Sequence, residues 1–169
     1  VPALIRGPGV KPGQNSSTVM LSMDWFPTVM DLTSNTPPKN ITIDGQSLLP
    51  VLQGKSGSID RDVFWHFPCY SGGKPASAIL SGGWKLIEFF ETNTVELYQL
   101  SNDPGESHDL AKSEPQRMAG LLEKLHSWQK ATGAPRPTEP NPAYDPSSVR
   151  KHGRDGHGKS GQRRQPSNP

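Results

Sequence analysis

Apolar positions in the first third of the chain predict one strand and one short helix. Residues 2–5 form an apolar run that ends at a Gly-Pro-Gly turn, which is typical of a buried strand. Further along, Phe26 and Val29 share one face of a short predicted helix. Asp24 is its expected N-cap, because a carboxylate accepts bonds from the free N–H groups of a first turn. The apolar residues of 44–54 predict one more compact segment.

Hydrophobic and polar residues in the centre of the chain alternate with the period of a strand. The alternation covers four segments, which are residues 63–67, 76–80, 85–90 and 95–100. Short turns join the last three, so these form an antiparallel meander. Leu86, Glu88 and Phe90 fall on one face of the predicted sheet, and Ile87 and Phe89 fall on the other. We therefore expect both faces to be covered, at least in part.

An amphipathic helix is predicted after the sheet. Its apolar stripe consists of Met118, Leu121, Leu122, Leu125 and Trp128. Ser113 and Gln116 have the spacing of a capping box. Gly133 is the expected end, because glycine readily adopts the left-handed conformation that closes many helices. Packed across the sheet, the stripe would complete a small core.

Composition narrows the class of protein. Glycine and proline make up about a fifth of the 169 residues, which predicts long irregular connections. No stretch approaches the roughly 18 apolar residues of a membrane span, and no signal peptide is visible. The single cysteine, Cys69, excludes a disulfide framework and a cysteine-rich zinc site. The net charge of +2 hides a basic tail, because residues 150–169 carry +5 and the rest −3, so it does not indicate a nucleic-acid-binding fold.

His66 is the most distinctive candidate for chemistry. Strand alternation places it with Phe64 on one side of an aromatic segment, and Trp65 and Phe67 on the other. Two interpretations stay open: a histidine at the edge of the core that is bonded to backbone, or a pocket-lining histidine beside aromatic walls that could stack on a sugar ring. Cys69 is expected to be a buried and inert thiol, because the sequence places no base for it.

Five segments, in order, resemble the C-terminal third of sulfatases of the arylsulfatase A-like type. They are VPALIRGPGVKPG, MDWFPTVMDLT, DGQSLLPVLQG, WKLIEFFE and ELYQLSNDPGESHDLA. The last is the most specific, and in it Asp109 stands where the family usually has Asn. The segments FWHFP and GAPRPTEPNPAYDP are similar to bacterial sulfatases of the N-acetylgalactosamine-6-sulfatase-like type.

The resemblance implies an α/β fold of the alkaline-phosphatase-like sulfatases, of which this chain is the C-terminal portion. Residues 1–54 would be the end of the large α/β domain, with its last strand and helix. Residues 55–146 would be a small α+β subdomain, a four-stranded antiparallel sheet packed by one C-terminal helix. Residues 147–169 are expected to form a disordered basic tail.

The resemblance also implies the chemistry of a sulfuric ester hydrolase that acts on sulfated carbohydrate. In the family a formylglycine, made from Cys or Ser in a Cys/Ser-x-Pro-x-Arg motif, attacks sulfur, and Ca²⁺ stabilises the sulfate oxygens. This sequence contains neither that motif nor an Asp-Asp pair, so we expect no catalytic residue and no metal ligand in it. Alone, the chain is expected to be inactive. The family location is periplasmic or secreted, with neither nucleic acid nor membrane as a partner.

Four residues are candidates for the wall of the substrate pocket. By their position near the family's substrate loops, these are His66, Tyr70, Lys74 and Ser77. Lys74 suits a second anionic group on the substrate, although a solvated loop lysine is the alternative interpretation. In the usual pattern a histidine stands in place of Cys69, so this subsite differs from that of the family.

Two other functions remain open at this point. The chain could be a non-catalytic module that holds sulfated polysaccharide through its basic tail and aromatic strand, or part of a related phosphoester or phosphonate hydrolase. The helix and strand of residues 1–54 have no sheet to cover their apolar side chains. We therefore expect exposed hydrophobic patches around Leu4, Ile5, Phe26 and Val29.

Overall fold

The computed structural model divides the chain into two compact units, Val1–Arg61 and Asp62–Pro169, and each is described here by itself. The residues described are 2–70, 74–137, 139 and 141–144. The basic tail expected at residues 147–169 lies outside these residues. None of the helices within them is long and apolar enough to cross a membrane.

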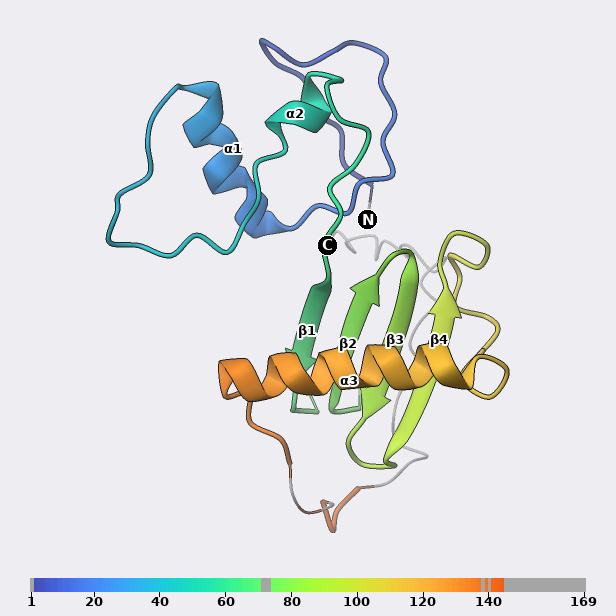
Figure 1. The fold of residues 1–169 in the computed structure, drawn as a ribbon. Coiled ribbons are helices and arrows are strands. Elements are labelled where there is room, and N and C mark those ends of the chain that lie inside the picture. The colour runs from blue at the N-terminus through green and yellow to red at the C-terminus, as the bar shows by residue number, and fades with distance from the viewer. Residues whose placement is uncertain (1, 71–73, 138, 140, 145–169) are drawn as a thin grey trace, which may run out of the picture. The chain divides into compact units, whose positions relative to one another are not determined.

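The first unit contains short helices joined by irregular chain. They are the 3-10 helix η1 (Ser22–Asp24), α1 (Trp25–Leu32) and α2 (Leu49–Leu52) (Figure 1). The prediction of a strand at residues 2–5 was wrong, because residues 2–6 are irregular and Leu4 is fully exposed. A strand needs a neighbour for its backbone N–H and C=O groups, and the described part of this unit contains no other strand.

Asp24 is the buried centre of the first unit. Its carboxylate lies 2.7 Å from Nη1 of Arg61 and accepts the backbone N–H groups of Leu21 (2.6 Å) and Gln46 (3.0 Å). Asp24 occupies the N-cap position of α1, as predicted. The predicted capping bond was wrong, because its side chain makes no hydrogen bond to the first turn of that helix. Instead the carboxylate joins three segments that are far apart in the sequence.

The buried position on α1 is polar. Thr28 is fully buried, and its hydroxyl donates to the carbonyl of Asp24 and accepts the N–H of Leu48 at 2.9 Å. Phe26 and Val29, on the predicted apolar face, are about half exposed. The expected exposure of apolar side chains in this part of the chain is confirmed at Leu4, Phe26 and Val29, whereas Ile5 is only partly exposed.

The second unit is built on a four-stranded antiparallel sheet. Its strands are β1 (Val63–Phe67), β2 (Ala76–Ser81), β3 (Trp84–Phe89) and β4 (Thr94–Gln99). They lie in sequence order, each paired with the next (Figure 1). All four predicted strands are confirmed, with ends that shift by no more than one residue.

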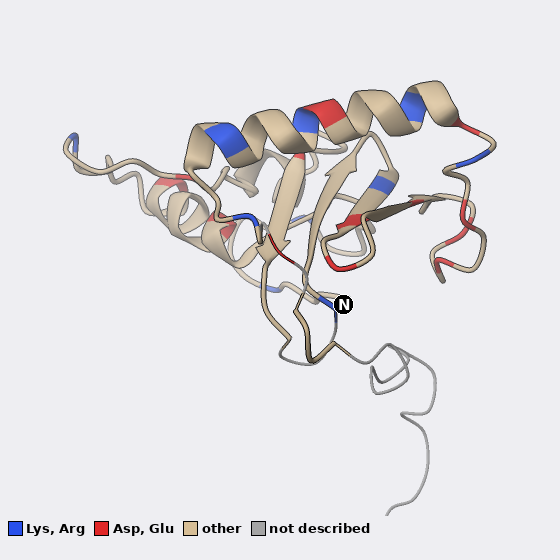
Figure 2. Cartoon of the chain, turned by 90° about the horizontal axis from the view of Figure 1, so that it is seen from below, with Lys and Arg blue, Asp and Glu red and all other residues tan. Residues whose placement is uncertain are grey.

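One long helix, α3 (Pro115–Thr132), lies across one face of this sheet (Figure 1). The core between them consists of Ile79, Leu86 and Leu97 from the strands and Leu121 and Leu125 from the helix. Met118, Leu122 and Trp128 pack against this core, so the predicted stripe is confirmed. Lysine, arginine and acidic residues are spread along α3 without forming a patch of one sign (Figure 2).

The two ends of α3 differ in how well the sequence predicted them. Gly133 ends the helix with φ of 63°, as expected. The prediction of a capping box at Ser113 and Gln116 was wrong. Glu114 is at the N-cap, and the hydroxyl of Ser113 donates to the carbonyl of Leu110. A serine hydroxyl can bond equally to a nearby backbone carbonyl, so spacing alone does not fix its partner.

Candidate functional site

His66 and Ser77 meet on the face of the sheet that α3 covers. The two residues face each other in the register of β1 and β2, and Nδ1 of His66 lies 2.6 Å from Oγ of Ser77. The other ring nitrogen, Nε2, lies 2.9 Å from the carbonyl oxygen of Pro135. A carbonyl only accepts, so Nε2 carries a proton, and in the neutral ring Nδ1 accepts the serine hydroxyl.

This pair has the composition of a nucleophile and its base, but not the exposure. Ser77 is 1% exposed, so its hydroxyl cannot reach a substrate. Both ring nitrogens of His66 already have partners within the fold. His66 therefore links the residues that follow α3 to the loop end of the hairpin formed by β1 and β2.

A buried carboxylate lies next in the same row across the sheet. Ser77 faces Glu88 in the register of β2 and β3, and Glu88 has a side-chain exposure of 6%. Its Oε1 lies 2.6 Å from Nη2 of Arg136 and 3.0 Å from Nε2 of His126. Its Oε2 is buried without a hydrogen-bond partner. Arg136 also lies over the ring of Phe90, 5.4 Å from its centroid.

Only part of this cluster could be predicted from the sequence. Alternation placed Glu88 on the same face as Leu86 and Phe90, which is an unusual place for a carboxylate and so a sign of a buried partner. His126 is exposed on α3, and nothing in the sequence pattern indicates that its Nε2 lies beside Glu88. Nothing in the spacing of Arg136, 48 residues further on, identified it as the partner.

Tyr70 and Lys74 lie apart from that cluster. The hydroxyl of Tyr70 donates to the carboxylate of Glu91, and its ring lies 6.3 Å from that of Tyr144. Nζ of Lys74 lies 5.4 Å from the ring centroid of Phe89, whose side chain belongs to the face turned away from α3. The structure thus brings His66 and Ser77 together and places Lys74 beside the opposite face.

Cys69 is exposed, so the expectation of a buried thiol was wrong. It follows the end of β1, where the chain leaves the sheet and no longer alternates between two covered faces. The next residues do not form the Cys/Ser-x-Pro-x-Arg motif from which formylglycine is made.

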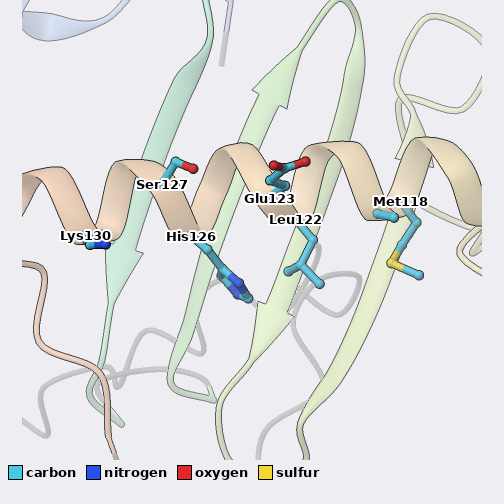
Figure 3. Close-up of a pocket in the computed structure, with 7 residues that line it drawn as sticks. Met118, Leu122, Glu123, His126, Ser127 and Lys130 are labelled. Carbon is cyan, nitrogen blue, oxygen red and sulfur yellow. The ribbon is translucent and has the colours of Figure 1, made fainter.

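A shallow depression of about 490 Å³ lies along α3. It is lined by Met118, Ala119, Leu122, Glu123, His126, Ser127 and Lys130. In Figure 3 the side chains of Leu122 and His126 point to one side of the helix and those of Glu123 and Ser127 to the other. All the lining residues come from one helix, so its polar groups do not converge on a ligand as in an enclosed binding site.

The described residues do not fit a calcium site. Among them, no group of three or more His, Cys, Asp or Glu side chains is placed to hold a metal ion. Calcium prefers six to eight oxygen ligands, usually including several carboxylates. The described part of this chain therefore lacks the ligand set of a calcium site.

Solved structures of sulfatases share the fold of this chain. The structure of BT4656 in complex with its substrate D-glucosamine-2-N,6-O-disulfate superimposes with a TM-score of 0.62 and 27% identity, over 77% of this chain and 28% of that one. A structure described as a 2-O GAG sulfatase gives a TM-score of 0.55 and 28% identity, over 76% and 29%. The fold is thus that of the C-terminal region of alkaline-phosphatase-like sulfatases.

Sequence comparison names the family. The family model described as "N-sulphoglucosamine sulphohydrolase, C-terminal" matches residues 1–131, so the chain belongs to this family of sulfatase C-terminal regions. Arylsulfatase K of Xenopus laevis is 30% identical over 75% of this chain and 25% of its own length. N-acetylglucosamine-6-sulfatase of Capra hircus is 28% identical over 86% and 33%. The chain thus spans a quarter to a third of these relatives.

Proposed function

We propose that this chain is the C-terminal part of an enzyme that hydrolyses sulfate esters of sulfated carbohydrates, and that it contributes to the wall of the substrate pocket. The observation that carries the proposal is the family match over residues 1–131. The names of the relatives support a sulfated sugar as the substrate, because one acts on N-acetylglucosamine 6-sulfate by its name and one is solved with a glucosamine disulfate.

Within this chain, the segment after β1 is the part that meets the substrate. Tyr70 is held by Glu91, and Lys74 has no carboxylate within ion-pair distance among the described residues. An ammonium group without a partner is suited to a sulfate, because it is a compact charge that a second anion does not already neutralise. His66 and Ser77 act behind this segment as positioning residues, since both are bonded within the fold.

The catalytic groups belong to the longer protein of which we propose that this chain is a part. By family resemblance these are calcium and a formylglycine, which together supply the nucleophile and stabilise the charge on the sulfate oxygens. This chain binds and orients the sugar. By the same resemblance the protein is periplasmic or secreted and comes from a bacterium.

Kinetics of two variants test the proposal. In the product of the whole reading frame, Lys74→Gln is expected to raise KM for a disulfated glucosamine substrate by about tenfold with little change in kcat, because it removes binding to a group that does not react. Lys130→Gln on the exposed side of α3 is the matched control. An unchanged KM in Lys74→Gln would show that Lys74 does not bind the substrate. Absence of sulfate release by the unaltered protein would refute the proposed hydrolysis itself.

A further inference from the structure

The face of the sheet turned away from α3 carries exposed aromatic side chains. Phe64 stacks on Trp128 of α3 and His66 lies beside it, so the alternate residues Trp65 and Phe67 point to the other face. Trp65 is 43% and Phe67 49% exposed. A contiguous exposed patch of apolar side chains commonly marks an interaction site.

Small residues separate these aromatics from a second apolar row. In the register of the sheet, Trp65 faces Ala78, which in turn faces Ile87. Phe67 faces Ala76, which in turn faces Phe89. Because alanine is small, the large side chains on either side of it remain accessible to a ligand. Lys74 lies over the ring of Phe89. We call the surface formed by Trp65, Phe67, Phe89 and Lys74 the aromatic face.

Lys74 is the one cation of this face without an ion-pair partner among the described residues. Lys85, on the same face of β3, is paired with Glu106 at 2.7 Å. Glu96, on β4 at the other edge of the sheet from Trp65 and Phe67, accepts the neutral hydroxyl of Tyr98 at 2.9 Å and keeps its negative charge. Lys74 lies over Phe89, and no described carboxylate is within ion-pair distance of it. The complementary ligand therefore has an apolar side and a negative charge next to it.

We propose that the aromatic face binds a sulfated sugar ring, with the C–H side of the ring stacked on Trp65 and Phe67 and a sulfate group at Nζ of Lys74. Sugars offer such an apolar side because their ring hydrogens gather on it, and a sulfate beside it supplies the charge. The inference rests on the proposed function. It places the sugar contact on the opposite face of the hairpin from Ser77, which is buried, and from His66, whose two ring nitrogens are bonded within the fold.

Binding by the whole 169-residue chain tests this directly. The probes are a sulfated glucosamine-uronate tetrasaccharide and the same tetrasaccharide after chemical desulfation, with affinity measured by calorimetry. Trp65→Leu and Phe67→Ala are each expected to weaken binding of the sulfated probe by about tenfold, because each removes one stacking surface. Lys74→Gln is expected to reduce the preference for the sulfated probe by about fivefold.

Matched controls separate the face from the rest of the chain. Trp25 on α1 is 40% exposed, so Trp25→Leu removes an equally exposed indole elsewhere, and Lys130→Gln removes an exposed ammonium group on α3. Both controls are expected to bind as the unaltered chain does. The basic tail is present in every variant, so its contribution cancels. Circular dichroism confirms that each variant is folded.

The outcomes distinguish this inference from the function on which it rests. Unchanged affinity in both Trp65→Leu and Phe67→Ala would overturn the proposal that the aromatic face binds sugar, whether or not the longer protein releases sulfate. Concentration-dependent dimerisation that Trp65→Leu abolishes, with sugar binding intact, also overturns it and makes the face a protein interface. Loss of binding in these variants upholds it even if no sulfate release is found, in which case the proposed hydrolysis alone is wrong.

Discussion

At the scale of single residues, the pair of Asp24 and Arg61 fixes the first unit. The two side chains are 0% and 9% exposed, and the carboxylate also accepts two backbone N–H groups. Burial by itself would raise the pKa of Asp24. The Arg61 guanidinium and the N–H groups of Leu21 and Gln46 outweigh burial and lower this pKa to about 2. A charge that is buried with a partner becomes costly when that partner is lost.

Asp24→Asn is therefore expected to destabilise the chain by about 3 kcal/mol, because it leaves the guanidinium of Arg61 buried without a counter-charge. Unfolding in urea measures this free energy. Asp31→Asn, at an exposed position of α1, is the matched control and should change it by less than about 0.5 kcal/mol. Equal effects of the two substitutions would show that the ion pair does not hold the unit together.

Acid should weaken the same contact in a defined range. The pKa of Asp24 is about 2 in the folded chain and near its ordinary value of 3.8 when unfolded, so the unfolded state takes up the proton first as pH falls. The ionised carboxylate of Asp24 therefore stabilises the folded chain by about 2 kcal/mol. This stabilisation is complete above about pH 5 and is lost progressively between about pH 5 and pH 2. The difference in unfolding free energy between the unaltered chain and Asp24→Asn should narrow over this range. A constant difference would contradict the assignment.

At the scale of elements, the four strands and α3 follow from the sequence. Strict alternation fixes which face each strand residue occupies, and a stripe of five apolar residues fixes the face of α3. The strand expected at residues 2–5 failed because pairing, which the local pattern does not contain, decides whether a strand forms. The bonds of Glu88 to Arg136 were missed for the same reason, since they join residues 48 positions apart.

The end of α3 gives a prediction with an internal control. Gly133 has φ of 63°, and a Cβ at this position would meet nothing within 4 Å. Gly133→Ala is therefore expected to cost about 1 kcal/mol of unfolding free energy through the backbone alone. Gly120, inside α3, also has open space around it, so Gly120→Ala should stabilise the chain by about 1 kcal/mol. Thermal unfolding measures both, and effects of the same sign would contradict the left-handed helix end.

The attachment of the segment after α3 can be tested by a double-mutant cycle. Glu88→Gln and Arg136→Ala each remove one side of the charged pair, so their effects should not add. We expect a coupling energy of about 1–3 kcal/mol in urea unfolding, because the carboxylate is 6% exposed and little screened by solvent. Additive effects would show that the segment is held by other contacts.

At the scale of the whole molecule, the site could be predicted only in outline. The order of motifs identified the family and so the class of substrate, because five segments in the right order are more specific than any one of them. The positions of individual side chains could not be obtained in this way. His66 and Ser77 came together beneath α3, while Lys74 came to the opposite face, since three-dimensional contacts decide which of two faces a ligand can reach.

Sulfate release tests the central claim most directly. The product of the whole reading frame that encodes residues 1–169 would be incubated with a disulfated glucosamine oligosaccharide, beside the 169-residue chain alone. We expect release of inorganic sulfate by the former and none by the latter, because this chain contains no formylglycine motif. Release by the 169-residue chain alone, or by neither protein, would contradict the claim that the chain is the substrate-binding C-terminal part of a sulfatase.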